Sequence, residues 1–364
     1  MPNNPDKLIR FAVLCCLLAV SLPAGMSAGE TSQPSHQERE SIGTTKETRF
    51  KELTSFCLNG AGNLLCCDAG DKVIRVISPV GKLMAVWKMP FAPHRICCAE
   101  DGAVYVGGEG ALARLDAQGK VNAKAASDGA VFPNARVSGL AATKDHLFAS
   151  LGNGWSLQSK AILLRFDREL KNGKEIARDL RGCCQRLDLA AHGGSLYAAE
   201  NARYRVVRFD AEGKSLSSWG SASRDTVEGF GSCCNPMNLF FGPGGELYTA
   251  ESGMGRIKRY TPDGKFLGLI GEVGVQRFTR AGRTAASCSN MTLAVSKDGS
   301  RIFVQDVAQN VIRVLLKEGV LVEGAPAAEA TVEIEPGTGA KPYGLPPGGM
   351  RQPGMRRPGM PPRQ

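Results

Sequence analysis

One unit recurs six times along the chain, and this internal repeat restricts the possible folds more than any other feature of the sequence. In its fullest form the unit reads as an apolar strand, a glycine turn, a second strand that ends in an acid, a third strand that bears an arginine, and a turn that ends in Gly-Lys. The units follow one another at a period of about 40 to 50 residues, which is typical of repeat architectures. The first turns of the units lie at Gly62, Gly102, Asp145, Gly194, Gly245 and Gly299.

The repeated unit predicts a small antiparallel sheet of four strands, of which the outermost is the least regular. One such sheet cannot bury both of its faces, so the six sheets must stack around an axis and close into a ring. The 44 glycines and 20 prolines fit many short strands joined by turns, and they argue against a helical bundle. We therefore expect an all-β fold, a six-bladed β-propeller formed by residues 50–325, in which residues 50–54 supply the strand that closes the sixth blade.

The two best preserved copies also resemble a known repeat family. Both contain the pattern Gly-x-hydrophobic-Tyr-x-Ala-Glu, at residues 194–200 and 245–251, and both continue with an arginine-bearing strand and Gly-Lys. Over roughly residues 54–317 the chain is similar to NHL-repeat proteins, and this resemblance implies a six-bladed propeller of NHL type. The family includes protein-binding, RNA-binding and lyase members, so the resemblance implies a fold rather than an activity. The doubled cysteines are similar to those of exported bacterial propellers.

The two ends of the chain differ from the repeats in composition. Lys7 and Arg10 precede a short apolar stretch and a run of small residues, which is typical of an export signal. We expect residues 1–28 to be a signal peptide and residues 29–49 a polar linker. The mature protein is then exported to the periplasm or the cell exterior and has no transmembrane segment. In residues 326–364 Pro-Gly-Met recurs among arginines, which predicts a disordered low-complexity tail.

The positive charge of the chain is concentrated in this tail. The formal net charge is +10, and residues 337–364 carry five basic residues and no acid. The repeats are therefore only mildly basic, and basic residues on outer strands are typical of a solvated sheet edge. We expect a monomeric protein without a nucleic-acid partner.

Ten cysteines follow the predicted signal peptide, and eight of them stand in adjacent pairs. Five of them precede the innermost strands of the last three units, where thiolates could converge near the axis on a soft metal ion such as Cu(I) or Zn. At least two of the three aligned ones, Cys184, Cys234 and Cys288, are then expected to lie close together. Packing as small buried side chains and disulfide formation remain open as alternatives for all the pairs. The five candidates for a metal or redox site are Cys183, Cys184, Cys233, Cys234 and Cys288.

An acid ends the second strand in four of the units, and an arginine follows it within a few residues. The acids are Asp68, Glu200, Glu251 and Asp306. A ring of carboxylates could bind cations. Catalysis rarely needs the same acid in four copies, so we interpret the acids as structural. Each one acts as a brace: it pairs with its arginine and fixes the hairpin.

Polar residues also precede the apolar part of the innermost strands, where they should face the mouth of the central channel. These candidate ligand-binding residues are Arg95, Asp188, Asn235, Asn238 and Asn290. In propellers of lactonase type, an acid and asparagines at this place hold a divalent cation that polarises a substrate carbonyl. Here no glutamate on the first blade completes such a set.

The sequence therefore favours an exported, non-enzymatic propeller that binds a protein or a small ligand on its channel face. The long connections at residues 220–232 and 271–287 would add to this surface. One alternative is a redox or soft-metal-handling protein that uses the axial cysteines, with a soft metal ion as its cofactor. A second alternative is a cation-dependent hydrolase of lactonase type.

Overall fold

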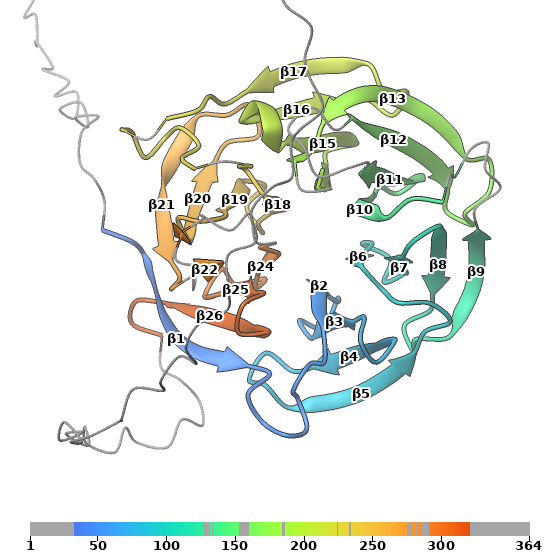
Figure 1. Ribbon diagram of the computed structural model, residues 1–364, viewed down its shortest axis with the longest axis horizontal. Helices are drawn as coiled ribbons and strands as arrows, with labels where there is room; N and C mark the ends of the chain where they lie inside the picture. Colours follow the sequence, from blue (N-terminus) through green and yellow to red (C-terminus); the bar gives the residue numbers. More distant parts are fainter. Residues whose placement is uncertain are drawn as a thin grey trace, which may run out of the picture. The chain divides into compact units, whose positions relative to one another are not determined.

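A computed structural model describes residues 33–320, apart from 127–131, 133, 153–159, 184–185, 224, 233, 275–278, 281–282 and 285–290. Six four-stranded antiparallel sheets surround a common axis, and the predicted six-bladed propeller is confirmed (Figure 1). The expected signal peptide and tail lie outside the described residues. Among the residues that the structure describes, no helix is long and apolar enough to span a bilayer.

Each of the first three blades follows the chain outward from the axis, one strand after another. Their strands, from the inside out, are β2 (Leu53–Leu58), β3 (Leu64–Asp68), β4 (Val73–Ile77) and β5 (Leu83–Lys88) in blade 1, β6 (Arg95–Cys98), β7 (Val104–Gly107), β8 (Ala111–Leu115) and β9 (Val121–Ala126) in blade 2, and β10 (Val137–Ala142), β11 (His146–Gly152), β12 (Lys160–Asp167) and β13 (Lys174–Arg181) in blade 3.

Blades 4 and 5 repeat this order, and blade 6 takes its outermost strand from the beginning of the chain. Their strands are β14 (Leu189–His192), β15 (Ser195–Glu200), β16 (Arg205–Phe209) and β17 (Ser215–Trp219) in blade 4, β18 (Asn238–Phe241), β19 (Leu247–Glu251), β20 (Arg256–Tyr260) and β21 (Phe266–Glu272) in blade 5, and β24 (Leu293–Val295), β25 (Arg301–Asp306), β26 (Val311–Lys317) and β1 (His36–Ile42) in blade 6. A short hairpin of β22 (Thr279–Arg280) and β23 (Arg283–Thr284) precedes blade 6, and a single 3-10 turn, η2 (Asn201–Arg203), follows β15.

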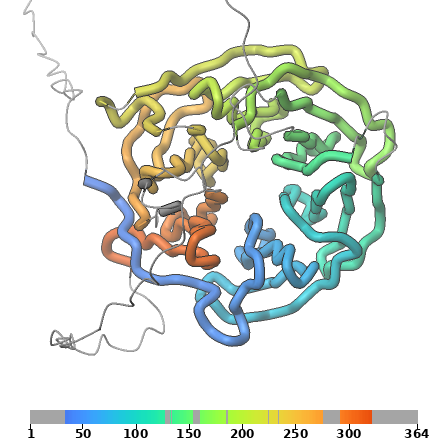
Figure 2. The backbone as a smooth tube through the Cα atoms, viewed as in Figure 1, coloured from blue at the N-terminus to red at the C-terminus, as the bar shows by residue number. Residues whose placement is uncertain are grey.

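The strand that closes blade 6 is β1, which corrects two of the predictions. It pairs antiparallel with β26 and lies within residues 29–49, which were expected to be a linker. Residues 50–54, expected to supply this strand, instead lead into β2, the innermost strand of blade 1. The sequence His-Gln-Glu-Arg-Glu-Ser-Ile is mostly polar because the outermost strand is half exposed, so it shows no apolar run. Figure 2 shows the first and last described segments meeting side by side on blade 6.

The hydrophobic core is divided into layers between neighbouring blades. Leu65 and Ile74 of blade 1 pack against Val104 and Val106 of blade 2, and a separate cluster fills each of the next four junctions. Because neighbouring blades cover both of its faces, all five residues of β3 are buried, whereas β5 at the rim alternates between half-buried and exposed. This stacking fixes the six innermost strands side by side around the axis.

Candidate functional site

The innermost strands of the six blades line a cavity along the axis. Its volume is about 290 Å³, and every blade contributes to its wall. Because each innermost strand is the first strand of its blade's β-meander, all six begin at the same end of the axis. We call this end the polar end, after the side chains of Arg95, Asp188, Asn238 and Thr292 that border it.

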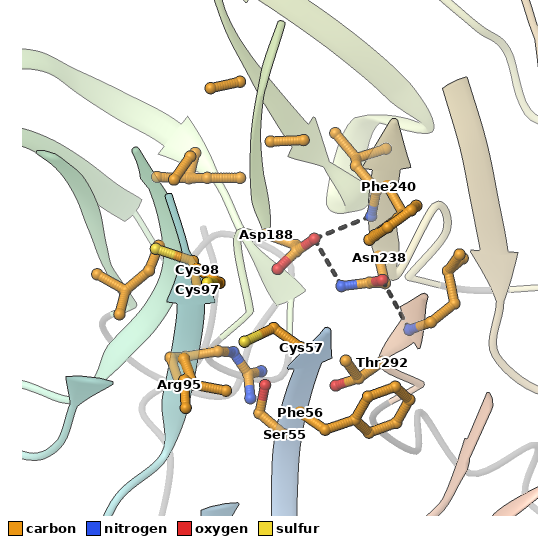
Figure 3. A pocket seen from close by; sticks show the side chains of 18 of the residues that line it. Ser55, Phe56, Cys57, Arg95, Cys97, Cys98, Asp188, Asn238, Phe240 and Thr292 are labelled. Atoms are coloured by element: carbon orange, nitrogen blue, oxygen red, sulfur yellow. Dashed lines mark hydrogen bonds between the residues drawn. The ribbon is translucent and has the colours of Figure 1, made fainter. Parts of the chain in front are cut away.

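Five blades each contribute one polar side chain to the polar end: Ser55 of β2 in blade 1, and the four side chains that give this end its name. Arg95 and Asn238 are the first residues of β6 and β18, while Asp188 and Thr292 directly precede β14 and β24. All four border the cavity (Figure 3). The structure therefore places Arg95, Asp188 and Asn238 where the sequence suggested, and their binding of a ligand stays a prediction.

Asp188 and Asn238 link blades 4, 5 and 6 through a chain of hydrogen bonds. Asn238 Nδ2 donates to Asp188 Oδ2 at 2.7 Å, and the backbone N–H of Leu239 donates to the same oxygen at 2.9 Å (Figure 3). Asn238 Oδ1 in turn accepts the backbone N–H of Leu293 at 2.9 Å. Both side chains thus border the cavity and tie together the blades that form it.

Arg95 performs the same double role on the opposite side of the ring. Its Nε donates to Ser138 O of blade 3 at 2.7 Å, and its Nη1 donates to Thr54 O of blade 1 at 3.0 Å. Nη1 also donates to the carbonyl of His94 at 2.8 Å. The guanidinium plane is therefore fixed by three backbone carbonyls while it faces the cavity.

These bonds belong to a belt that joins every blade to the next at the polar end. A buried polar group is stable only when its hydrogen bonds are made, and here the partner is the backbone of the neighbouring blade. The two remaining junctions of the belt are closed by Gln305 Nε2 to Leu53 O (2.6 Å) and Ser150 Oγ to Leu187 O. Thr54 Oγ1 adds a second bond between blades 1 and 2, to Pro93 O at 2.7 Å.

Burial changes the acidity of both charged groups of the polar end. Burial raises the pKa of Asp188 to about 7, although the positive charge of Arg95 and the N–H of Leu239 oppose this rise. Burial also lowers the pKa of Arg95 to about 10, and the charge of Asp188 acts in the opposite direction. At neutral pH Asp188 therefore exists both as a carboxylate and as a neutral acid, so it can accept or donate a hydrogen bond.

The other end of the cavity, which we call the thiol end, carries Cys57, Cys97 and Cys98. Cys57 belongs to β2, and Cys97 and Cys98 end β6. For Cys97 and Cys98 the sequence left packing and disulfide formation open, and it gave Cys57 no role. In the structure all three are only partly buried and border the cavity (Figure 3). The apolar residues around them are Leu58, Ala142, Ala191, Phe240 and Phe241.

One of the predicted mouth residues, Asn235, lies elsewhere. Asn235 is fully buried in the connection before β18, where its side chain bonds the carbonyls of Gly231 and Ser252 and accepts the N–H of Ser252 at 2.8 Å. It holds this connection against the end of β19 and does not line the cavity, because it lies three residues before the strand that does. Asn290 lies outside the described residues.

The structure describes two of the five cysteines that were proposed for a metal or redox site. Cys183 and Cys234 are buried in one apolar cluster together with Met237 and Met291. Cys184, Cys233 and Cys288 lie outside the described residues, so the expected proximity of Cys184, Cys234 and Cys288 stays a prediction. The expected disulfides are not found among Cys57, Cys66, Cys67, Cys97 and Cys98, which are all thiols.

The four repeated acids lie at the polar end of their blades, outside the cavity wall. Each is fully or almost fully buried and contacts the arginine that follows it, at 2.5 to 2.9 Å. Each also accepts backbone N–H groups. Asp68 and Glu251 take theirs from the connection that enters their blade, and Glu200 takes one from Arg181 at the end of β13. The pairs are Asp68–Arg75, Glu200–Arg205, Glu251–Arg256 and Asp306–Arg313.

Within the described part of the chain, no three side chains of histidine, cysteine, aspartate or glutamate are grouped so that they could hold a metal ion. At the polar end Asp188 is the one carboxylate among the described residues of the wall.

Comparison with known proteins supports the fold and no particular activity. No protein-family model and no curated protein matches the chain, so the NHL type stays a prediction. Among solved structures, a gluconolactonase from Xanthomonas campestris is 14% identical with a TM-score of 0.51, over 73% of this chain and 86% of that one. The calcium-binding protein regucalcin from Agrobacterium tumefaciens is 15% identical with a TM-score of 0.51, over 78% and 95%.

A third solved structure is a catalytically inactive virginiamycin B lyase from Staphylococcus aureus with quinupristin. It is 13% identical with a TM-score of 0.50, over 76% of this chain and 98% of that one. The chain is a six-bladed β-propeller. At such low identity these likenesses show the fold alone.

Proposed function

We propose that this propeller is a binding protein that takes a small ligand into its axial cavity. The observation that carries the proposal is the wall of the cavity, which is drawn from all six blades and changes from charged groups at the polar end to apolar groups and thiols at the thiol end. A volume of about 290 Å³ lies near the lower limit of known small-molecule sites, roughly 300 Å³.

The wall favours an amphipathic ligand. A polar head placed between Arg95 and Asp188 would find a fixed guanidinium and a carboxyl group that can accept or donate a hydrogen bond. An apolar body would then lie along Phe240 and Ala191 toward the thiol end. Because the belt already holds the polar groups in place, binding would require little rearrangement, which is the usual basis of affinity in a preformed site.

Two observations support binding rather than cation-dependent hydrolysis. The described wall of the cavity contains one carboxylate and no histidine. One oxygen of that carboxylate already accepts two hydrogen bonds, from Asn238 and Leu239. The structural neighbours are a lactonase, a calcium-binding protein and a lyase, and their likeness to this chain in fold does not select among these activities.

The proposal includes export. The pattern of residues 1–28 supports it, since a basic start, an apolar stretch and small residues are the features of an export signal. The ligand would then be a small molecule of the periplasm or the cell exterior.

Ligand binding can be tested with a panel of medium-chain carboxylic acids, alkylamines and lactones, measured by isothermal titration calorimetry with and without CaCl₂. Ala191→Phe places a ring in the cavity and removes none of the bonds of the belt, so it should abolish binding of any panel member that the wild type binds. Leu216→Phe, on the exposed strand β17, is the matched control and should bind like the wild type.

Two results would contradict the proposal. A panel member that binds Ala191→Phe as tightly as the wild type would have its site outside the cavity. Hydrolysis of the lactones that depends on added CaCl₂ would show that the protein is an enzyme.

A further inference from the structure

Two thiols of the cavity belong to neighbouring blades. Cys57 is the fifth residue of β2, and Cys98 is the last residue of β6, the innermost strand of the next blade. Both side chains border the cavity and are only partly buried, so the cavity connects them to solvent. The pair lies at the thiol end of the cavity, away from the polar end where the head of the proposed ligand would bind.

The packing of the blades directs these two thiols toward the same junction. Side chains along a strand alternate between its two faces. Cys57 and Cys98 both pack against the apolar cluster between blades 1 and 2, which also contains Cys67. Cys97, one residue before Cys98, packs against the cluster between blades 2 and 3. In Figure 3 the sulfur of Cys57 is directed toward β6.

Around Cys57 and Cys98, the described side chains of the cavity wall provide sulfur atoms as potential metal ligands and otherwise apolar groups. The described neighbours at the thiol end are aliphatic and aromatic, among them Leu58 and Phe240. Burial, followed by the nearby thiols of Cys98 and Cys97, raises the pKa of Cys57 well above its ordinary value. Burial also raises the pKa of Cys98, which a hydrogen bond with the backbone of Gly60 opposes. At neutral pH both groups are protonated thiols and poor nucleophiles.

We propose that Cys57 and Cys98 form a two-coordinate site for a soft monovalent cation, with Cu(I) as its chemical type. Thiolate ligands select Cu(I) over the oxygen-seeking cations. Zinc sites use at least three protein ligands, and the described residues contain no set of three. On binding, two S–H bonds break, two S–Cu bonds form, two protons pass to solvent, and copper stays Cu(I). The ion would reach the site through the cavity.

The test is a competition for Cu(I) under anaerobic conditions. The full chain is titrated into the complex of Cu(I) with bathocuproine disulfonate, whose absorbance reports the copper that remains on the chelator. The wild type should withdraw about one more Cu(I) per chain than Cys57→Ser or Cys98→Ser. In these variants the affinity of that site should fall by more than about tenfold, which is already the loss typical of changes to outer-shell partners.

Cys97→Ser is the matched control, because it removes a thiol of the same cavity that packs at the other junction. It should bind like the wild type, and circular dichroism should show all three variants folded. Because binding releases two protons, the apparent affinity for Cu(I) should increase as the pH is raised. Below the pKa values of the thiols the increase should reach up to about a hundredfold per pH unit.

The proposal is overturned if Cys97→Ser loses the copper as readily as the other two variants. It is also overturned if Cys57→Ser and Cys98→Ser both keep it, since the copper would then lie at the remaining cysteines. X-ray absorption on the loaded wild type should show two sulfur ligands, and oxygen or nitrogen ligands would likewise contradict it.

Discussion

Two carboxylates at equivalent positions in blades 4 and 5 have different counter-ions. Glu200 and Glu251 are both fully buried, and each accepts a backbone N–H, Glu200 from Arg181 at the end of β13 and Glu251 from Gly231 before β18. Glu200 pairs with two arginines whose side chains are 42% and 35% exposed. Glu251 pairs instead with Arg256 and with Lys258, and the side chain of Lys258 is fully buried. If the carboxylate is removed, water can solvate the two arginines of Glu200, but it cannot reach the buried ammonium group of Lys258.

We therefore expect Glu251→Gln to cost more stability than Glu200→Gln. Breaking an ion pair in which both partners are buried costs about 3–5 kcal/mol. Loss of the Glu200 charge should cost less, about 1–3 kcal/mol, because its two arginines reach water. Urea denaturation followed by circular dichroism measures both free energies of unfolding. Equal costs would refute the comparison, and loss of ligand binding at unchanged stability would show that these acids are not braces.

Asp188 should make the stability of the protein depend on pH. Burial raises its pKa from 3.8 to about 7. A folded chain that binds this proton more tightly than the unfolded chain is stabilised by protonation, so the contribution of Asp188 to the free energy of unfolding grows as the pH falls from about 7 to about 4. Asp188→Asn removes the titration and keeps an oxygen that can accept the N–H of Leu239.

The difference in unfolding free energy between the wild type and Asp188→Asn, measured in urea from about pH 8 to about pH 5, should shift in favour of the wild type at the acidic end. A difference that stays constant, or that favours the wild type as the pH rises, would show that the pKa of Asp188 is not raised in the folded protein.

Strands that are covered on both faces could be predicted from the sequence, whereas strands at the rim could not. β19 is buried throughout, and its apolar run is legible without a structure. β1 is half exposed and mostly polar, so nothing local distinguishes it from a linker. The same limit applies to the site. Residues of the polar end could be found because they precede an apolar run. The strand of Cys57, in contrast, changes register with its neighbour between Leu53 and Ser55, and no residue pattern marks this change.

The connection between blades 4 and 5 is held in place by buried side chains of β20. Lys258 Nζ donates to the carbonyls of Val227 and Gly229 at 3.0 and 2.8 Å. The hydroxyl of Tyr260 donates to the carbonyl of Glu228 at 2.7 Å. The sequence suggested residues 220–232 as part of the binding surface, and these bonds show that the middle part of this connection is fixed to the blade.

We expect Lys258→Met to release this part of the connection. Methionine can keep the apolar contacts with the ring of Phe230 but donates no hydrogen bond to the two carbonyls. Hydrogen exchange should become faster at residues 226–231 and stay unchanged in β15 and β16. Lys124→Met, on the exposed face of β9, is the matched control and should change neither region. Unchanged exchange at residues 226–231 in Lys258→Met would show that other contacts hold the connection.

The whole ring is closed at two radii. Near the axis, the belt of hydrogen bonds joins each blade to the next, from Gln305 of blade 6 to the carbonyl of Leu53 in blade 1. At the rim, β1 completes blade 6, and the register runs from His36 opposite Lys317 to Ile42 opposite Ile312. Glu38 adds an ion pair with Arg313 at 3.1 Å. The outer closure depends on a segment of the chain that precedes the first blade.

Removal of β1 should therefore weaken the whole ring. A variant that lacks residues 1–42 loses the pairing with β26, the ion pair of Glu38 and the buried side chain of Ile42. A variant that lacks residues 1–32 keeps them all and is the control. The shorter chain should unfold more than roughly 4 °C below the control in calorimetry, since each kcal/mol shifts the midpoint of a domain of this size by roughly 2–4 °C.

The exposed edge of β26 should also promote association between chains in size-exclusion chromatography, because an unpaired edge strand accepts another strand. If both variants are monomeric and unfold at the same temperature, the belt around the axis is sufficient to close the ring.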